Sequence, residues 1–143
     1  MSNQQIVTTE FFARRLADLC LRSGMSGLPK DDFSRHVLFT SMVAGLPIDA
    51  ALGEQEINAA LARWIQASQI KELDHITLRR SLVDAGYLGR RSDGTGYRVV
   101  ADPPGQPPYE AGVARLDLQA VLEARREEMA RRKAEYLARS GKP

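Results

Sequence analysis

The stretch "DHITLRRSLVDAGYLGRRSDGTGYRVV" (Asp74–Val100) decides the fold. Asp74 suits the N-cap position of a helix, apolar residues follow it at helical spacing, and Gly86 ends the pattern, so we expect a helix over 75–85. After Gly86 the sequence changes to short flanks around Asp93-Gly94, a dipeptide typical of hairpin turns, and the second flank, which contains Tyr97, favours a strand. A helix followed directly by a β-hairpin is therefore predicted.

Two further helices precede this stretch. "LPKDDFSRHVLFTSMVAGLP" (28–47) predicts a helix that starts near Pro29 and stops before Pro47. "GEQEINAALARWIQASQI" predicts a helix over 54–68, in which Trp64 belongs to the apolar face. Between them "PIDAAL" (47–52) favours a short extended segment. This order is that of a winged helix-turn-helix, a mainly α (α+β) fold whose second paired helix enters the major groove of DNA.

The flanks add a helix at each end of this unit. Thr8 and Thr9 precede an amphipathic stretch expected to form a helix over 9–22. Prolines make up four of the ten residues in "ADPPGQPPYE", which predicts a linker. The tail predicts one long helix over about 117–139. The predicted division is an N-terminal helix (1–27), a winged-helix-like domain (28–101), a proline-rich linker (102–116) and a C-terminal amphipathic helix (117–143).

Bulk properties point away from several classes of protein. The formal net charge is +2, too small for charge alone to indicate nucleic-acid binding. No signal peptide or membrane-spanning apolar run is visible, so we expect a cytoplasmic protein without membrane contact. Cys20 is the single cysteine, and with His36 and His75 it forms no metal-binding spacing. No catalytic constellation is visible either, and we therefore expect a non-enzyme without metal or cofactor.

The two arginines of the first pair differ in their surroundings. On a helical wheel of 75–86, Arg79 falls within the apolar arc with Ile76, whereas Arg80 lies on the opposite arc. Arg79 is therefore predicted to have a structural role, paired with an acidic side chain; the candidates are Asp74, Glu72 and Glu56. Arg80, Thr77 and Ser81 form the candidate base- and phosphate-contacting surface, the alternative being a solvated face with Arg80 paired to Asp84.

The hairpin supplies the second candidate surface. Arg90, Arg91 and Arg98 are placed where a wing commonly contacts phosphate. A longer loop over 92–96 would set Arg90 opposite Arg98, and such a like-charged pair would favour an anion over both. A two-residue turn at Asp93-Gly94 shifts the register and removes that argument, leaving a solvated polar hairpin as the alternative.

Some features favour a role without DNA. The helix opening "GEQE" places Glu54 and Glu56 where DNA phosphate would approach a helix N-terminus. A protein–protein interaction module on the same scaffold is therefore the alternative hypothesis. RNA or ribosome association shares the basic hairpin but lacks an aromatic stacking platform.

Two of the predicted helices carry more apolar surface than packing within one domain is expected to cover. The 29–44 helix is apolar nearly all round, and the 117–139 helix carries a thin apolar stripe between mixed charges. Because helix-turn-helix proteins commonly bind DNA as dimers, we expect a homodimer through these two helices.

Three blocks of the chain resemble a known family. They are "LPKDDFSRHVLFTSMVAGL", "GEQEINAALARW" and "DHITLRRSLVDAGYLGRRSDGTGYRV", within residues 28–99. Together they are similar to an uncharacterised bacterial domain of unknown function that is sometimes found behind arsenic-repressor-type helix-turn-helix modules. The resemblance implies a winged-helix-like fold and a link to transcription control, or a sensor or dimerisation role, and it supplies no catalytic residue or ligand. Arg79, Arg80, Asp84 and Tyr97 match the family's motif.

Overall fold

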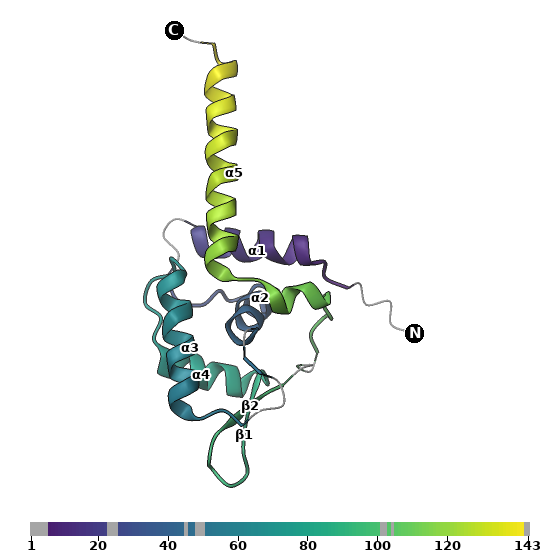
Figure 1. The fold of residues 1–143 in the computed structure, drawn as a ribbon, viewed down its shortest axis with the longest axis vertical. Coiled ribbons are helices and arrows are strands. Elements are labelled where there is room, and N and C mark those ends of the chain that lie inside the picture. The colour runs from purple at the N-terminus through teal and green to yellow at the C-terminus, as the bar shows by residue number, and fades with distance from the viewer. Residues whose placement is uncertain are drawn as a thin grey trace.

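The computed structural model describes residues 6–22, 26–44, 46–47, 51–100, 103 and 105–141. Within them the fold is mainly helical with one small antiparallel hairpin, which confirms the predicted α+β class (Figure 1). The order of helices and strands is also the predicted one, except that the short helix η1 lies within the predicted linker. In chain order the elements are α1 (Thr9–Leu21), α2 (Asp32–Val43), α3 (Glu54–Ala67), α4 (His75–Asp84), β1 (Leu88–Arg90), β2 (Tyr97–Val99), the short 3-10 helix η1 (Ala111–Arg115) and α5 (Leu118–Arg139).

Side-chain caps set where the helices begin. Thr8, Asp31, Asp74 and Asp117 each accept a hydrogen bond from a backbone N–H three residues ahead, at the starts of α1, α2, α4 and α5. Such caps satisfy backbone donors that have no partner inside the helix. The predicted start of the second helix near Pro29 is therefore wrong by a few residues, because the Asp31 carboxylate fixes the first turn at Asp32.

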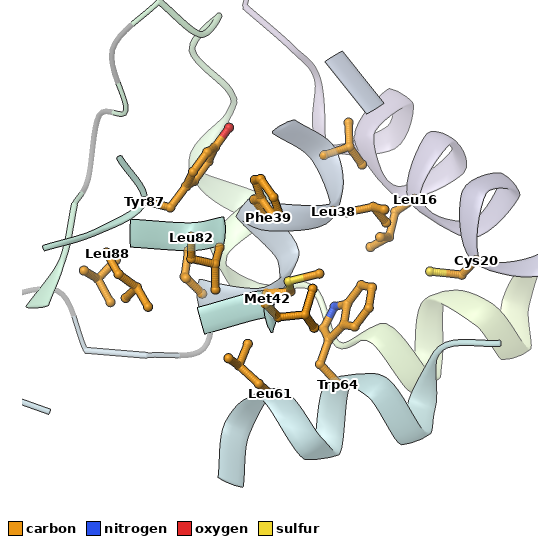
Figure 2. Packing of buried hydrophobic residues seen from close by; sticks show 14 of the residues in the cluster. Leu16, Cys20, Leu38, Phe39, Met42, Leu61, Trp64, Leu82, Tyr87 and Leu88 are labelled. Carbon is orange, nitrogen blue, oxygen red and sulfur yellow. The ribbon is translucent and has the colours of Figure 1, made fainter. Parts of the chain in front are cut away.

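Helix α2 lies at the centre of the molecule. Eight of its 12 residues are buried, and Figure 1 shows it nearly end-on between α1, α3 and α4. In Figure 2 its Leu38, Phe39 and Met42 face Leu16, Tyr87 and Trp64, which come from three other parts of the chain. The apolar surface of α2 is thus covered by its own chain. Little apolar surface of α2 is left for a second subunit, and the expected dimer contact through the 29–44 helix stays a prediction.

The extended segment before α3 pairs with the hairpin. The Leu52 N–H donates to the Tyr97 carbonyl at 2.9 Å, and the Tyr97 N–H donates to the Leu52 carbonyl at 2.8 Å. Leu52 therefore adds one residue of a third strand beside β2, as the winged-helix order requires. Half of the predicted 47–52 segment, residues 48–50, lies outside the described residues.

The hairpin register excludes one of the two turn alternatives. Arg90 pairs with Tyr97, Gly89 with Arg98 and Leu88 with Val99. This register is centred on Asp93-Gly94, so the alternative that sets Arg90 opposite Arg98 is wrong. The cause is burial: Leu88, Tyr97 and Val99 are at most 7% exposed, and a slip of one residue would turn Tyr97 and Val99 out of the core.

The proline-rich segment packs onto the rest of the fold. The Val7 N–H donates to the Pro108 carbonyl at 2.8 Å, and the Glu110 N–H donates to the Val7 carbonyl at 2.9 Å. In η1, which follows, Val113 is fully buried. The described part of the predicted linker therefore joins the start of α1 to the start of α5 through specific contacts.

A hydrogen-bonded cluster is buried under this segment. His36 is 1% exposed, with Nε2 3.3 Å from the Pro107 carbonyl and Nδ1 2.6 Å from the Tyr87 hydroxyl. A carbonyl can only accept, so Nε2 carries the proton and the Tyr87 hydroxyl donates to Nδ1. Burial lowers the pKa of His36 and raises the pKa of Tyr87. The cluster thus holds a neutral imidazole in the core.

Candidate nucleic-acid interface

Arg79 ties α4 to α3. Its guanidinium lies 3.1 Å from the Glu54 carboxylate and donates to the Asn58 side-chain carbonyl, with 13% of the side chain exposed. The ion pair is thus with Glu54 and not with any of the three acids named from the sequence, because Arg79 points toward the first turn of α3. Those three side chains are engaged elsewhere: Asp74 with Thr77, Glu72 with Ser26, and Glu56 with the Gly53 N–H.

Tyr97 lies beneath two guanidiniums. Those of Arg79 and Arg90 are 5.9 Å and 5.8 Å from the centre of its ring, within the range of cation–π attraction. The ring is 7% exposed, so it fixes one end of each arginine without offering a stacking surface of its own. A hollow of about 350 Å³ opens at this place between α4 and the hairpin. It is lined by Glu54, Arg79, Arg80, Val83, Asp84, Arg90 and Tyr97.

Arg80 and Arg90 are the available cations of the hollow. Both are exposed, and neither makes an ion pair with another described residue. The alternative pairing of Arg80 with Asp84 is not formed, although both side chains line the hollow. The structure therefore brings together one arginine from the second paired helix and one from the wing.

The exposed face of α4 includes Ile76, an apolar residue that its position on the helical wheel predicts to be buried. Ile76 is instead 46% exposed, and the buried residues of α4 are Leu78 and Leu82. Ile76 precedes Arg80 by four positions, and residues four apart lie on one helix face. The spacing itself was the signal that could have placed Ile76 beside Arg80.

The two hydroxyl residues of α4 differ in availability. The backbone N–H and the hydroxyl of Thr77 both bond to Asp74, at 2.9 Å and 2.8 Å. These bonds lower the pKa of Asp74 and commit the Thr77 proton, although the exposed hydroxyl oxygen can still accept. Ser81 is half-buried beside Arg80. Of the predicted contact residues on α4, Arg80 is thus the most accessible donor.

Arg91 and Arg98 do not line the hollow. Arg91 begins the loop, where its Nε is 3.9 Å from the Asp93 carboxylate. Arg98 is exposed on the other face of the hairpin and extends over Gly89, where an added Cβ would lie 3.3 Å from Arg98 Nε. Glycine therefore leaves room for the Arg98 side chain to lie flat on the hairpin. The predicted wing arginines face more than one direction.

Trp64 anchors α3 on α2. Its indole is 6% exposed and donates to the Ser41 hydroxyl of α2 at 2.8 Å, and Figure 2 shows the ring beside Met42.

Over the ranges that the structure describes, no group of three or more histidine, cysteine or acidic side chains could hold a metal. Nor does any helix there have the length and apolar character to span a bilayer.

Sequence comparison relates most of this unit to one bacterial family. A family model, DUF2087, described as an uncharacterised protein conserved in bacteria, matches residues 25–99. The match takes in α2, α3, α4 and the hairpin, and so includes every residue that lines the hollow. No curated protein and no solved structure matches the chain.

Proposed function

The chain belongs to DUF2087, a bacterial family, and we propose that it is a DNA-binding winged helix-turn-helix protein that regulates transcription. One observation carries the proposal: the guanidiniums of Arg80, from α4, and Arg90, from the wing, border a single hollow, and neither makes an ion pair with a described residue. A phosphate group needs several such donors at one place. In this proposal a DNA strand passes over the hollow between α4 and the hairpin.

The exposed face of α4 would enter the major groove. Arg80 can donate two hydrogen bonds to the edge of a guanine, and Ile76, one turn earlier, can contact a thymine methyl group. Thr77 and Ser81 add hydroxyl groups for a base edge or a phosphate. Sequence preference then depends mainly on Arg80 and Ile76.

The wing would hold the backbone. Arg90 reaches the phosphate over the hollow, and Arg91 and Arg98 extend the positive charge along the loop and the outer face of the hairpin. These contacts add affinity without sequence preference, and each phosphate neutralised adds about 0.9 to the slope of log K against log salt.

The acidic opening of α3 is less of an obstacle than its sequence suggests. Glu54 pairs with Arg79, and the Glu56 carboxylate reaches back to the Gly53 N–H. Charges satisfied in this way repel an approaching phosphate less than free carboxylates do. Asp84 is the acidic residue of the hollow that has no ion pair among the described residues, and it opposes anion binding there.

The direct experiment compares the double variant Arg80→Ala/Arg90→Ala with the unchanged protein. Binding of both to random-sequence duplex DNA is measured by mobility shift across a series of salt concentrations. We expect weaker binding and a salt slope smaller by about 2. The matched control is Lys30→Ala with Arg63→Ala, which removes the same charge from exposed positions that line neither the hollow nor the α5 stalk. Equal losses in the two variants would mean that net charge alone attracts DNA and would overturn the assigned surface.

A protein-interaction module is the second candidate. The exposed apolar side chains of the α5 end, Met129, Tyr136 and Leu137, favour it. The same mobility shift separates the two functions, because non-specific DNA affinity should be visible at tens of micromolar protein in low salt. Absence of retardation there would favour the interaction module.

A further inference from the structure

The outer part of α5 stands clear of the domain. From Met129 to Arg139, here called the stalk, every residue is exposed, and Figure 1 shows this part of the helix extending beyond the rest of the fold. Met129, Tyr136 and Leu137 are 49%, 70% and 59% exposed. Short helices are only marginally stable in water without tertiary packing. The large exposed apolar side chains of the stalk therefore indicate that another protein surface packs against them.

The apolar stripe of the stalk continues one that is already in use. Leu122, Met129 and Tyr136 are spaced by seven residues and therefore share one side of the helix. Leu122 is 1% exposed where the base of α5 packs on the domain. The same side of the helix is thus covered at its base and open along the stalk.

A groove of about 540 Å³ runs between α1 and the base of α5. Much of its floor is apolar, with Leu116, Val121 and the methyl groups of Ala13, Ala17, Ala120 and Ala124. Glu10 and Asp117 also line it, and neither has an ion-pair partner among the described residues. The stalk, in contrast, carries Arg131, Lys133 and Arg139 without such partners. Arg115 of the groove and Glu135 of the stalk also lack ion-pair partners among the described residues. The charges without ion pairs are nevertheless mainly acidic in the groove and mainly basic in the stalk, and both surfaces carry apolar groups.

We propose that a second copy of this chain covers the stalk. The two α5 helices pack antiparallel about a two-fold axis near Glu127, and each stalk lies along the groove of the other copy. Groove and stalk belong to the same helix, so one two-fold operation satisfies both at once, as an isologous interface requires. The inference does not depend on DNA binding.

Charge selects the antiparallel direction. In this register Tyr136 lies level with Leu118 of the second copy, and Lys133 lies level with the groove residue Val121, about one helical turn from the second copy's Asp117. A parallel pair would instead set the two Lys133 side chains level with each other, and like charges at such distances repel. The antiparallel pair thus joins opposite charges and covers the apolar stripe.

The first test is the mass of the full-length chain, measured by sedimentation. We expect twice the mass of one chain at tens of micromolar and a monomer after Met129→Glu with Tyr136→Glu. The control, Ala134→Glu with Ala138→Glu, adds the same charge to the opposite side of the stalk and should leave the dimer intact. Circular dichroism of each variant checks that α5 is still helical. A monomeric unchanged protein, or equal effects of the two variants, would overturn the proposal.

The second test reports the direction of pairing. Cys20 is buried, and burial raises the pKa of its thiol to about 12. We therefore expect Cys20 to form no disulfide under mild oxidation. Arg126→Cys lies near the two-fold axis and should form an intermolecular disulfide. Tyr136→Cys should not, because the two copies of this position are about 27 Å apart along the helices. Cross-linking through Tyr136→Cys without Arg126→Cys would show parallel pairing and refute the proposed arrangement.

Discussion

The guanidinium of Arg90 lies 5.8 Å from the ring centre of Tyr97, its partner across the hairpin ladder. Arg79 approaches the same ring from α4 at 5.9 Å. One buried aromatic side chain therefore positions an arginine of the wing and an arginine of the second paired helix. This relationship couples the orientation of the hairpin to that of α4.

Replacing the aromatic ring should loosen both arginines. Tyr97→Leu keeps an apolar side chain but removes the cation–π attraction, so we expect a lower free energy of unfolding by about 1–2 kcal/mol and weaker DNA binding. Tyr97→Phe keeps the ring and should stay close to the unchanged protein in both respects. Urea unfolding and mobility shift make the comparison. Equal behaviour of the leucine and phenylalanine variants would show that the ring does not position the arginines.

The neighbours Arg79 and Arg80 should respond differently to truncation. Arg79→Ala breaks the contacts with Glu54 and Asn58, and we expect it to lower the free energy of unfolding by about 1 kcal/mol, since Glu54 is 61% exposed and the pair is partly screened. Arg80→Ala removes an exposed side chain that makes no ion pair with a described residue, and the variant should stay within about 0.5 kcal/mol. Urea unfolding midpoints test this. An equal loss of stability in the two variants would contradict the different roles of Arg79 and Arg80.

The different surroundings of Arg79 and Arg80 also show which side-chain contacts a sequence can predict and which it cannot. Separating Arg79 from Arg80 needed only their places on a wheel, because neighbours on a helix point in different directions. Choosing Glu54 over Glu56 as the partner of Arg79 required the crossing of α3 and α4, which depends on packing far from either residue. The hairpin register likewise followed from the burial of Tyr97 and Val99. Local patterns therefore predicted the elements, whereas partner choice depended on tertiary contacts.

Stability should fall on mild acidification because of His36. Burial lowers its pKa in the folded state below the usual 6.5, so the unfolded chain takes up the proton first. The contribution of the neutral imidazole is complete above about pH 6.5 and is lost as the pH falls from there toward the folded pKa. His36→Gln keeps hydrogen-bonding capacity but cannot be protonated in this range.

The measurement is the urea midpoint of both proteins between pH 5 and 8. We expect the unchanged protein to lose more stability than His36→Gln below about pH 6.5. Because the variant can also be less stable at neutral pH, the slopes with pH are compared rather than the absolute values. Parallel slopes would mean that His36 is not the titrating group.

The proposed dimer has a consequence for how DNA would be bound. Figure 1 places the hairpin and the outer end of α5 at opposite ends of the long axis of the molecule. A two-fold axis near the middle of α5 then directs the two hairpins away from each other. Such a dimer cannot place both wings on adjacent half-sites of one short duplex, and we expect it to bridge two separate duplexes instead.

Bridging can be measured by capture of a fluorescent duplex on beads that carry a second duplex. The unchanged protein should retain the fluorescence, whereas Met129→Glu with Tyr136→Glu should bind single duplexes in solution but capture none. Arg80→Ala with Arg90→Ala should remain dimeric and lose affinity for each duplex. These two variants separate the DNA surface from the dimer surface, because each removes one property and preserves the other. Capture by the monomeric stalk variant would exclude bridging through α5.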